Sequence, residues 1–382
     1  MVSKFFKIPR LRQHEEDNRH ATWLELFFDL VLVAAISQVG HLLVDVDSLH
    51  GVFIYVALFW IIFWVWCGHT IYSTRFDVDD PFFRILTFFN MFSLVIMAVE
   101  VHNVAHGHGK LFGGAYLVSR ILLLILLVRA YKHVSSVRNL IRIYLMGFGT
   151  AASIFAFSYL LDEPQNYYLW ALAITLDGLT PWVIWKMQQD QKQISAEHVP
   201  ERFGLFTIIV LGEGVIALVS GFDGISWTGS SFLIAFLSFI ITATIWWVYF
   251  THIERAMGKI KLGSGQPYIY SHFPLLVGIV AVGIGILRLL TESNNETVSD
   301  MTIYILVGGY ALWLLGGILL HFVICPLEAI TKMFISCNIV IFIMLCLIGY
   351  FSRGENALMV AVLMSTTSLI YAIWDGVARN TN

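Results

Sequence analysis

Residues 21–44, "ATWLELFFDLVLVAAISQVGHLLV", are long and apolar enough to cross a bilayer, yet they carry Glu25 and Asp29. A membrane-spanning helix needs about 20 mainly apolar residues, and a charged side chain at its centre costs at least about 2.5–3.5 kcal/mol. The two acids are four residues apart, so they share one face of a helix. The stretch therefore predicts a spanning helix whose acidic face lines a polar interior.

The rest of the chain repeats this apolar character. Of its 382 residues, 58% are hydrophobic and 13% are charged, whereas a soluble domain carries about 25% charged residues. We therefore predict an all-α polytopic membrane protein with about 12 transmembrane helices. The expected spans are 21–44, 51–73, 82–104, 111–132, 139–161, 166–187, 203–222, 227–251, 268–290, 301–325, 327–350 and 356–377.

The basic residues predict the orientation, because Lys and Arg accumulate in cytoplasmic loops. Nineteen of the 23 lysines and arginines fall on the side of the N-terminal tail, and three fall on the other side. We expect a multi-pass protein of the inner (plasma) membrane with both termini in the cytoplasm. No basic stripe or nucleic-acid motif is present, so no nucleic-acid partner is expected.

A polar linker divides the spans into two sets of six. We expect a cytosolic tail at 1–20, a first six-helix repeat at 21–187, the linker at 188–202 and a second repeat at 203–382. Aromatic stretches followed by His recur at 63–72 and 245–255, and an apolar-Asp-Gly triplet recurs at 173–179 and 371–377. An even number of spans in each half predicts parallel repeats related by an axis along the membrane normal.

Several other spans carry polar residues, which in a membrane helix indicate a functional site or a buried ion pair. The candidate residues for substrate binding or ion coupling are Glu25, Asp29, Glu213, Asp177, His272, Arg202, Glu201, Arg84 and Asp375. The alternative is structural: each acid could be an ion-pair partner of Arg84, Arg120 or Arg202. No cofactor or metal site is predicted, because the four cysteines lack metal-ligand spacing. The spacing of the histidines at 102–108 could hold Zn or Cu, but a solvated loop explains it as well.

Three blocks carry a resemblance to a known family. "ATWLELFFDLVLVAA" (21–35), "ERFGLFTIIVLGEGVIAL" (201–218) and "YSHFPLLVGIV" (270–280) resemble the bacterial low temperature requirement A family. The resemblance implies a multi-pass membrane protein and supplies no substrate. Its signature residues map to Trp23, Glu25, Phe28, Asp29, Glu201, Arg202, Gly212, Glu213, His272 and Pro274.

The favoured hypothesis is a proton-coupled secondary transporter of an unidentified small solute or ion, with a cavity open to the cytoplasm. Asp29 and Glu213 would be equivalent coupling carboxylates, Glu25 and His272 would relay the proton, and Arg202 or Arg84 would neutralise an anionic group. A cation channel and a membrane-embedded lipid-modifying enzyme remain alternatives, although no ATPase or soluble-hydrolase motif is present. The partners expected are membrane lipids and the solute, with a homo-oligomer left open.

Overall fold

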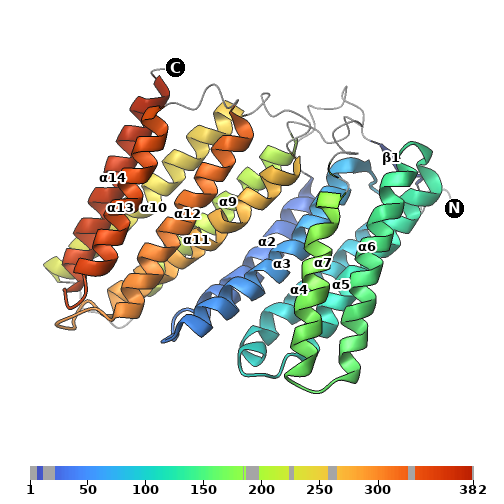
Figure 1. Cartoon of the computed structure of the whole chain (residues 1–382), viewed down its shortest axis with the longest axis horizontal. Coiled ribbons are helices and arrows are strands. Elements are labelled where there is room, and N and C mark those ends of the chain that lie inside the picture. The colour runs from blue at the N-terminus through green and yellow to red at the C-terminus, as the bar shows by residue number, and fades with distance from the viewer. Residues whose placement is uncertain are drawn as a thin grey trace. The chain divides into compact units, whose positions relative to one another are not determined.

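The computed structural model describes residues 7–11, 22–183, 185, 198–222, 228–256, 265–325 and 332–380. Within these ranges the fold is all-α, with two short strands, β1 (Arg10–Leu11) and β2 (Phe76–Asp77), paired antiparallel (Figure 1). The long helices are α2 (Trp23–His41), α3 (Leu49–Arg75), α4 (Pro81–Ala105), α5 (Lys110–His133), α6 (Arg138–Phe157), α7 (Gln165–Val183), α9 (His198–Ser220), α10 (Gly229–Ala256), α11 (Gly265–Thr291), α12 (Asp300–Ile324), α13 (Lys332–Phe351) and α14 (Ala357–Asn380). Short 3-10 turns, η2 (Ser135–Val137) and η3 (Ser158–Leu160), flank α6.

These helices confirm the predicted all-α polytopic fold. Among the described residues, eleven helices are long and apolar enough to cross a membrane. The exception is α7, which begins with Gln165 and Asn166 and carries Asp177 near its middle. Of the predicted polar segments, residues 1–6, 12–20 and 188–197 lie outside the described residues, and the last five residues of the expected linker form the first turn of α9.

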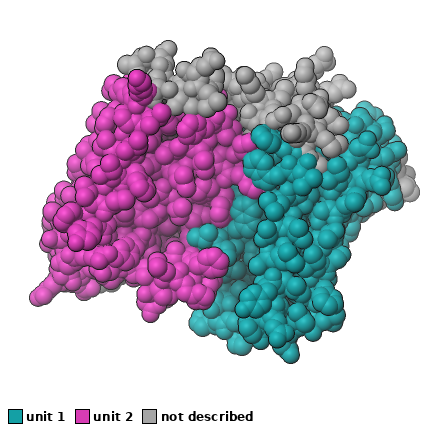
Figure 2. All heavy atoms as spheres, viewed as in Figure 1, with its two compact units in different colours: residues 1–39, 56–202, 261–266 teal, residues 40–55, 203–260, 267–382 magenta. Residues whose placement is uncertain are grey.

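The chain divides into two compact units, coloured separately in Figure 2. Unit 1 comprises residues 1–39, 56–202 and 261–266, and unit 2 comprises residues 40–55, 203–260 and 267–382. In unit 1, α4 packs on α5, α5 on α6, and α6 on α7. In unit 2, α12 packs on α13, and α14 packs on both α10 and α13. The boundaries of the two six-helix repeats remain a prediction.

Helix α4 of unit 1 begins where its sequence requires. Asp80 is the N-cap residue and accepts a hydrogen bond from the backbone N–H of Phe83, and Pro81 follows at the first helical position. Both are preferred there, because the cap satisfies a free N–H and proline has none to satisfy. Asp80 is 1% exposed and forms a buried ion pair with Arg129 of α5. The same carboxylate therefore caps α4 and ties it to α5.

Glycines set the contact between α11 and α12 in unit 2. Gly278 and Gly285 on α11 face the α12 backbone at Trp313 and Leu306, and Gly309 and Gly316 on α12 face α11. Each pair is seven residues apart, which returns to the same helix face after two turns. Small residues allow membrane helices to approach closely. Gly278 and Gly285 therefore let the backbones of α11 and α12 come into close contact.

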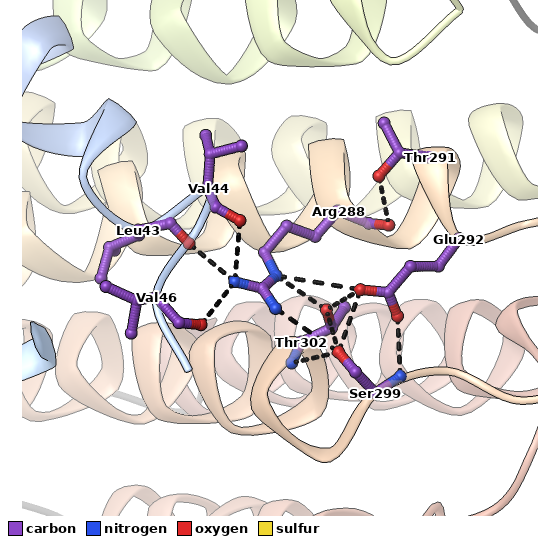
Figure 3. Close-up of polar contacts among 8 residues, drawn as sticks. All are labelled: Leu43, Val44, Val46, Arg288, Thr291, Glu292, Ser299 and Thr302. Atoms are coloured by element: carbon purple, nitrogen blue, oxygen red, sulfur yellow. Dashed lines mark hydrogen bonds and ion pairs between the residues drawn. The ribbon is translucent and has the colours of Figure 1, made fainter. Parts of the chain in front are cut away.

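Arg288, near the end of α11, holds the connection between α2 and α3 within unit 2 (Figure 3). Its Nη1 lies 2.9 Å from each of the carbonyl oxygens of Leu43, Val44 and Val46. Its Nε donates to Thr302 Oγ1 at 2.8 Å and lies 3.9 Å from a carboxylate oxygen of Glu292. A planar guanidinium can serve all these acceptors at once, whereas a lysine ammonium could not.

We expect Arg288→Gln to destabilise unit 2 by about 1–3 kcal/mol, because it leaves partly buried carbonyl oxygens without donors. The melting temperature of the detergent-purified protein, followed by tryptophan fluorescence, measures this. Arg353→Gln is the matched control, since Arg353 is exposed and lies over the rings of Tyr304 and Tyr350. Equal melting temperatures for the two variants would show that the Arg288 contacts contribute nothing.

Candidate functional site

The first acid of the opening stretch has a local structural role. The Thr22 backbone N–H donates to Glu25 Oε2 at 2.8 Å, and the Glu25 N–H donates to Thr22 Oγ1 at 3.3 Å. This reciprocal pair is a capping box, which satisfies two free N–H groups at a helix start. The spacing Thr-x-x-Glu therefore fixes the beginning of α2 and places Asp29 one turn further along the same face.

Asp29 is fully buried and lies in a cluster of unit 1 residues that come from α2, α3 and the first turn of α9. Its Oδ1 accepts a hydrogen bond from Arg202 Nη2 of α9 and another from Trp66 Nε1 of α3, both at 2.7 Å. Arg202 is 1% exposed, and its Nη1 lies 3.5 Å from Glu25 Oε2. Two carboxylates one turn apart thus share one guanidinium, with the closer contact to Asp29.

One carboxylate oxygen of Asp29 makes no hydrogen bond with a described residue. Its Oδ2 is buried and has no hydrogen-bond partner among the described residues. A buried carboxylate oxygen without a donor is costly unless a proton, a cation or water satisfies it. Asp29 Oδ2 could therefore accept a proton or pair with a cation.

His69 of α3 lies beside this cluster in an aromatic setting. It is 4% exposed, and its ring lies 4.4 Å from that of Phe28 and 5.5 Å from that of Phe83. Its Nε2 is 3.4 Å from Thr87 Oγ1, and that hydroxyl donates to the Phe83 carbonyl at 2.9 Å. Because the Thr87 proton is used there, we assign the proton of His69 to Nε2.

A pocket of about 620 Å³ opens next to Glu25. Helices α2, α3 and α4 contribute to its wall, together with the segment that joins α3 to α4. Its charged lining residues are Glu25, Asp77, Asp79 and Arg84. Arg84 pairs with Asp79 at 2.8 Å in an exposed ion pair, so it does not compensate the buried acids. Glu25 thus connects the pocket to Arg202 and, through it, to Asp29.

A second buried ion pair lies elsewhere in unit 1. Asp177 of α7 is fully buried, lies 3.2 Å from Arg120 Nη1 of α5 and accepts a hydrogen bond from the Tyr116 hydroxyl at 2.7 Å. The Arg120 guanidinium also lies 5.1 Å from the centre of the Tyr116 ring. Asp177 is therefore compensated by a matched cation, which is the structural alternative considered for every acid.

Unit 2 holds a hydrogen-bonded chain around His272. Its Nδ1 lies 2.8 Å from the Tyr268 carbonyl and must carry the proton, so its Nε2 accepts from the Tyr249 hydroxyl at 3.1 Å. Thr207 Oγ1 lies 3.0 Å from the Tyr249 hydroxyl and 2.7 Å from the Phe203 carbonyl. These hydrogen bonds link α9, α10 and α11, and the side chains that make them are buried.

The remaining acids, on α9 and α14, differ in their burial and in their contacts. Glu201 is half-buried in the first turn of α9, where the helix dipole favours an acid. Asp375 of α14 is 4% exposed. Glu213 is half-buried on α9 and has neither a hydrogen bond nor an ion pair with any described residue.

Comparison with known proteins decides the family. The model of the family described as bacterial low temperature requirement A protein (LtrA) matches residues 20–374, nearly the whole chain. The chain belongs to the LtrA family. An uncharacterized protein of Rhizobium meliloti (strain 1021), RA0937, is 28% identical over 291 residues, which cover 72% of this chain and 71% of the relative. No solved structure matches the chain.

LtrA membership together with eleven candidate spans makes the chain an integral, multi-pass membrane protein. Two of the signature blocks meet in unit 1, since Glu25 and Asp29 come from the first block and Arg202 from the second. Arg84 lines the neighbouring pocket, and Asp177 forms its own pair with Arg120. Glu213, His272 and Asp375 belong to unit 2, and Glu201 belongs to unit 1.

The interpretation of the sequence missed two members of these clusters. Trp66 was not among the candidate site residues, yet its indole N–H donates a hydrogen bond to Asp29 Oδ1. Tyr116, which donates to Asp177, carried no sequence signal beyond its position one turn before Arg120. Within the described residues, no group of three His, Cys, Asp or Glu side chains could hold a metal ion.

Proposed function

We propose that this LtrA protein is a proton-coupled secondary transporter of a small solute or ion. The observation that carries the proposal is the sharing of Arg202 by Glu25 and Asp29 beside the 620 Å³ pocket. Charged residues inside a membrane protein are expensive and commonly mark proton or ion pathways. The solute would enter the pocket, and the carboxylates would exchange the proton.

The geometry suggests how coupling would work. With Asp29 ionised, its Oδ1 binds both Arg202 and the Trp66 indole. A proton on the free Oδ2 would weaken the hold of Asp29 on the guanidinium, and Arg202 would then pair with Glu25, which already lies 3.5 Å away. Because Glu25 lines the pocket, this movement would change the charge that the solute meets there.

Under the predicted two-repeat plan, the two halves would carry different residues at the position of Asp29. Trp66 of α3 donates to Asp29 of α2, and the corresponding helices of the second half carry the Thr207–Tyr249 hydrogen bond between α9 and α10. Under a two-repeat plan, Thr207 would then occupy the place of Asp29, and Glu213 would be an additional acid. Under that plan Asp29 and Glu213 would not be equivalent, and the coupling acid would lie in the first repeat.

The location follows from the distribution of Lys and Arg. We propose the bacterial inner membrane, with both termini in the cytoplasm, because nineteen of the 23 basic residues fall on that side. With that orientation, the end of α3 and the start of α4 face the cytoplasm, and so does the pocket that they line.

The test is proton movement in sealed proteoliposomes of known orientation, which contain a pH-sensitive dye and are given pH and potassium gradients with a panel of solutes. We expect one solute class to drive proton flux and Asp29→Asn to reduce that flux to background. The asparagine still accepts from Trp66 and Glu25 remains beside Arg202, so the variant should fold.

Asp47→Asn is the matched control, because it makes the same change in charge at an exposed position of the loop between α2 and α3. Wild-type flux from folded Asp29→Asn protein would refute the coupling role. A solute-independent cation leak would support a channel instead. If no flux is seen and a divalent metal co-purifies in an Asp29-dependent way, the lipid-modifying enzyme becomes the better hypothesis.

A further inference from the structure

The corner where α5 ends and α6 begins lies at one surface of the membrane. Both helices belong to candidate spans, Lys110–His133 and Ser135–Leu160, and only Val134 separates the two spans. Val134 and Val137 are buried in a hydrophobic cluster of unit 1, so the corner is packed against its helices. Its exposed side chains therefore have defined positions at the boundary between membrane and water.

The exposed side chains of this corner are strongly basic. Lys132, Arg138 and Arg142 are exposed, and so is His133. Residues 101–161, which include all of α5 and α6, contain no Asp or Glu. Neither helix therefore supplies an acid that could neutralise these charges.

Arg138 is held in place by the end of α5. Its Nε donates to the Tyr131 carbonyl at 3.2 Å, and its guanidinium lies 5.6 Å from the centre of the Tyr131 ring. These contacts bring the guanidinium to the last turn of α5, where Lys132 follows Tyr131. Arg142 lies one turn further along α6, on the same face as Arg138. A cation that is already positioned loses less conformational freedom when it binds an anion.

Apolar stripes lead from these cations into the membrane. The exposed side chains on one face of α5 are Ile121, Ile125 and Val128. Their spacing of four and three residues continues to Lys132, so the cation ends this stripe. On α6, Met146 is 63% exposed and lies one turn beyond Arg142. Apolar side chains that are exposed on a spanning helix face the hydrocarbon of the bilayer.

We propose that the α5–α6 corner binds the headgroup of an anionic phospholipid. The phosphate would contact Lys132, Arg138 and Arg142, and the acyl chains would lie along the two stripes. Each Lys or Arg near the membrane surface strengthens the attraction to an anionic lipid about fivefold, so such a lipid is favoured over a zwitterionic one. The continuity of cations and apolar stripes favours a lipid over a soluble phosphate. The proposal does not rest on the proposed transport.

Lipid binding to the full-length protein, purified in a neutral detergent, tests this site. Native mass spectrometry counts the bound lipids while phosphatidylglycerol or phosphatidylcholine with the same acyl chains is added. We expect wild-type protein to bind phosphatidylglycerol at least about tenfold more tightly than phosphatidylcholine, and Arg138→Gln to lower the phosphatidylglycerol affinity about fivefold. The triple variant Lys132→Gln/Arg138→Gln/Arg142→Gln should bind the two lipids about equally.

Arg353→Gln is the matched control, because Arg353 is also exposed and also lies over tyrosine rings, but between α13 and α14 of unit 2. It should leave the phosphatidylglycerol affinity unchanged, and glycerol 3-phosphate at the same concentration should not displace the lipid. Displacement by glycerol 3-phosphate would show a site for phosphate alone and would overturn the lipid assignment. Equal binding of both lipids by wild-type protein, an equal loss in Arg353→Gln, or a preference that survives the triple variant would overturn it as well.

Discussion

Gly316→Val is expected to unfold the α11–α12 contact of unit 2 and to prevent recovery of a monodisperse protein. A Cβ atom at this position would lie 2.5 Å from the backbone N and Cβ of Leu275, closer than any real side chain approaches. Since the obstruction includes backbone, rotamer changes cannot relieve it, and the helices must separate. We expect a loss of more than about 3 kcal/mol, at the upper end of overpacking effects.

The adjacent Gly317 provides the control, because a Cβ there would meet nothing within 4 Å. Gly317→Val changes the same residue type by the same volume on the same helix, so intrinsic helix propensity cannot distinguish the two variants. A second pair, Gly309 and Gly308, repeats the comparison two turns earlier on α12. Size-exclusion profiles and melting temperatures measure both pairs. Similar behaviour of Gly316→Val and Gly317→Val would contradict the close-packed interface.

Much of this fold could be predicted from sequence because the bilayer imposes strict limits on it. Helix length is set by the bilayer thickness, and so each predicted span matches an observed helix to within several residues. The span predicted at 166–187 is the weakest, because α7 is too polar to satisfy the same apolar criterion as its neighbours. Gly278 and Gly285 could be assigned to a helix contact from their spacing, but their partners on α12 required the structure.

Less of the candidate site could be predicted, because the choice of the arginine that pairs with each acid depends on tertiary contacts. The sequence indicated that Asp29 and Asp177 needed cations and offered three arginines, but it could not choose among them. In the structure Arg202 serves Asp29 and Arg120 serves Asp177, whereas Arg84 pairs with the exposed Asp79. Asp80 and Arg129 lie at the ends of apolar spans, where charged residues are ordinary, so nothing marked them as a buried pair.

Asp80→Asn is expected to destabilise unit 1 by about 3–5 kcal/mol, since it leaves the Arg129 charge buried without its partner. Arg129 is 6% exposed, and both of its terminal nitrogens donate to the Asp80 carboxylate. Asparagine remains a good N-cap residue, so the loss would report the charge and not the start of α4. Asp79→Asn is the control next in sequence, where the exposed pair with Arg84 contributes under about 1 kcal/mol.

The same carboxylate should govern stability in acid. Burial raises the pKa of Asp80, but hydrogen bonds from Arg129 and from the backbone N–H groups of Phe83 and Lys7 outweigh it, so the pKa lies below its ordinary value. A lowered native pKa means that the unfolded state binds the proton more readily. The contribution of Asp80 is therefore fully present above its unfolded pKa of about 3.9 and is lost as the pH falls through the native value. The gap in melting temperature between wild-type and Asp80→Asn protein should stay constant from pH 7 to about pH 4 and narrow only below that, and a gap that narrowed already above pH 5 would show that the Asp80 charge is not the cause.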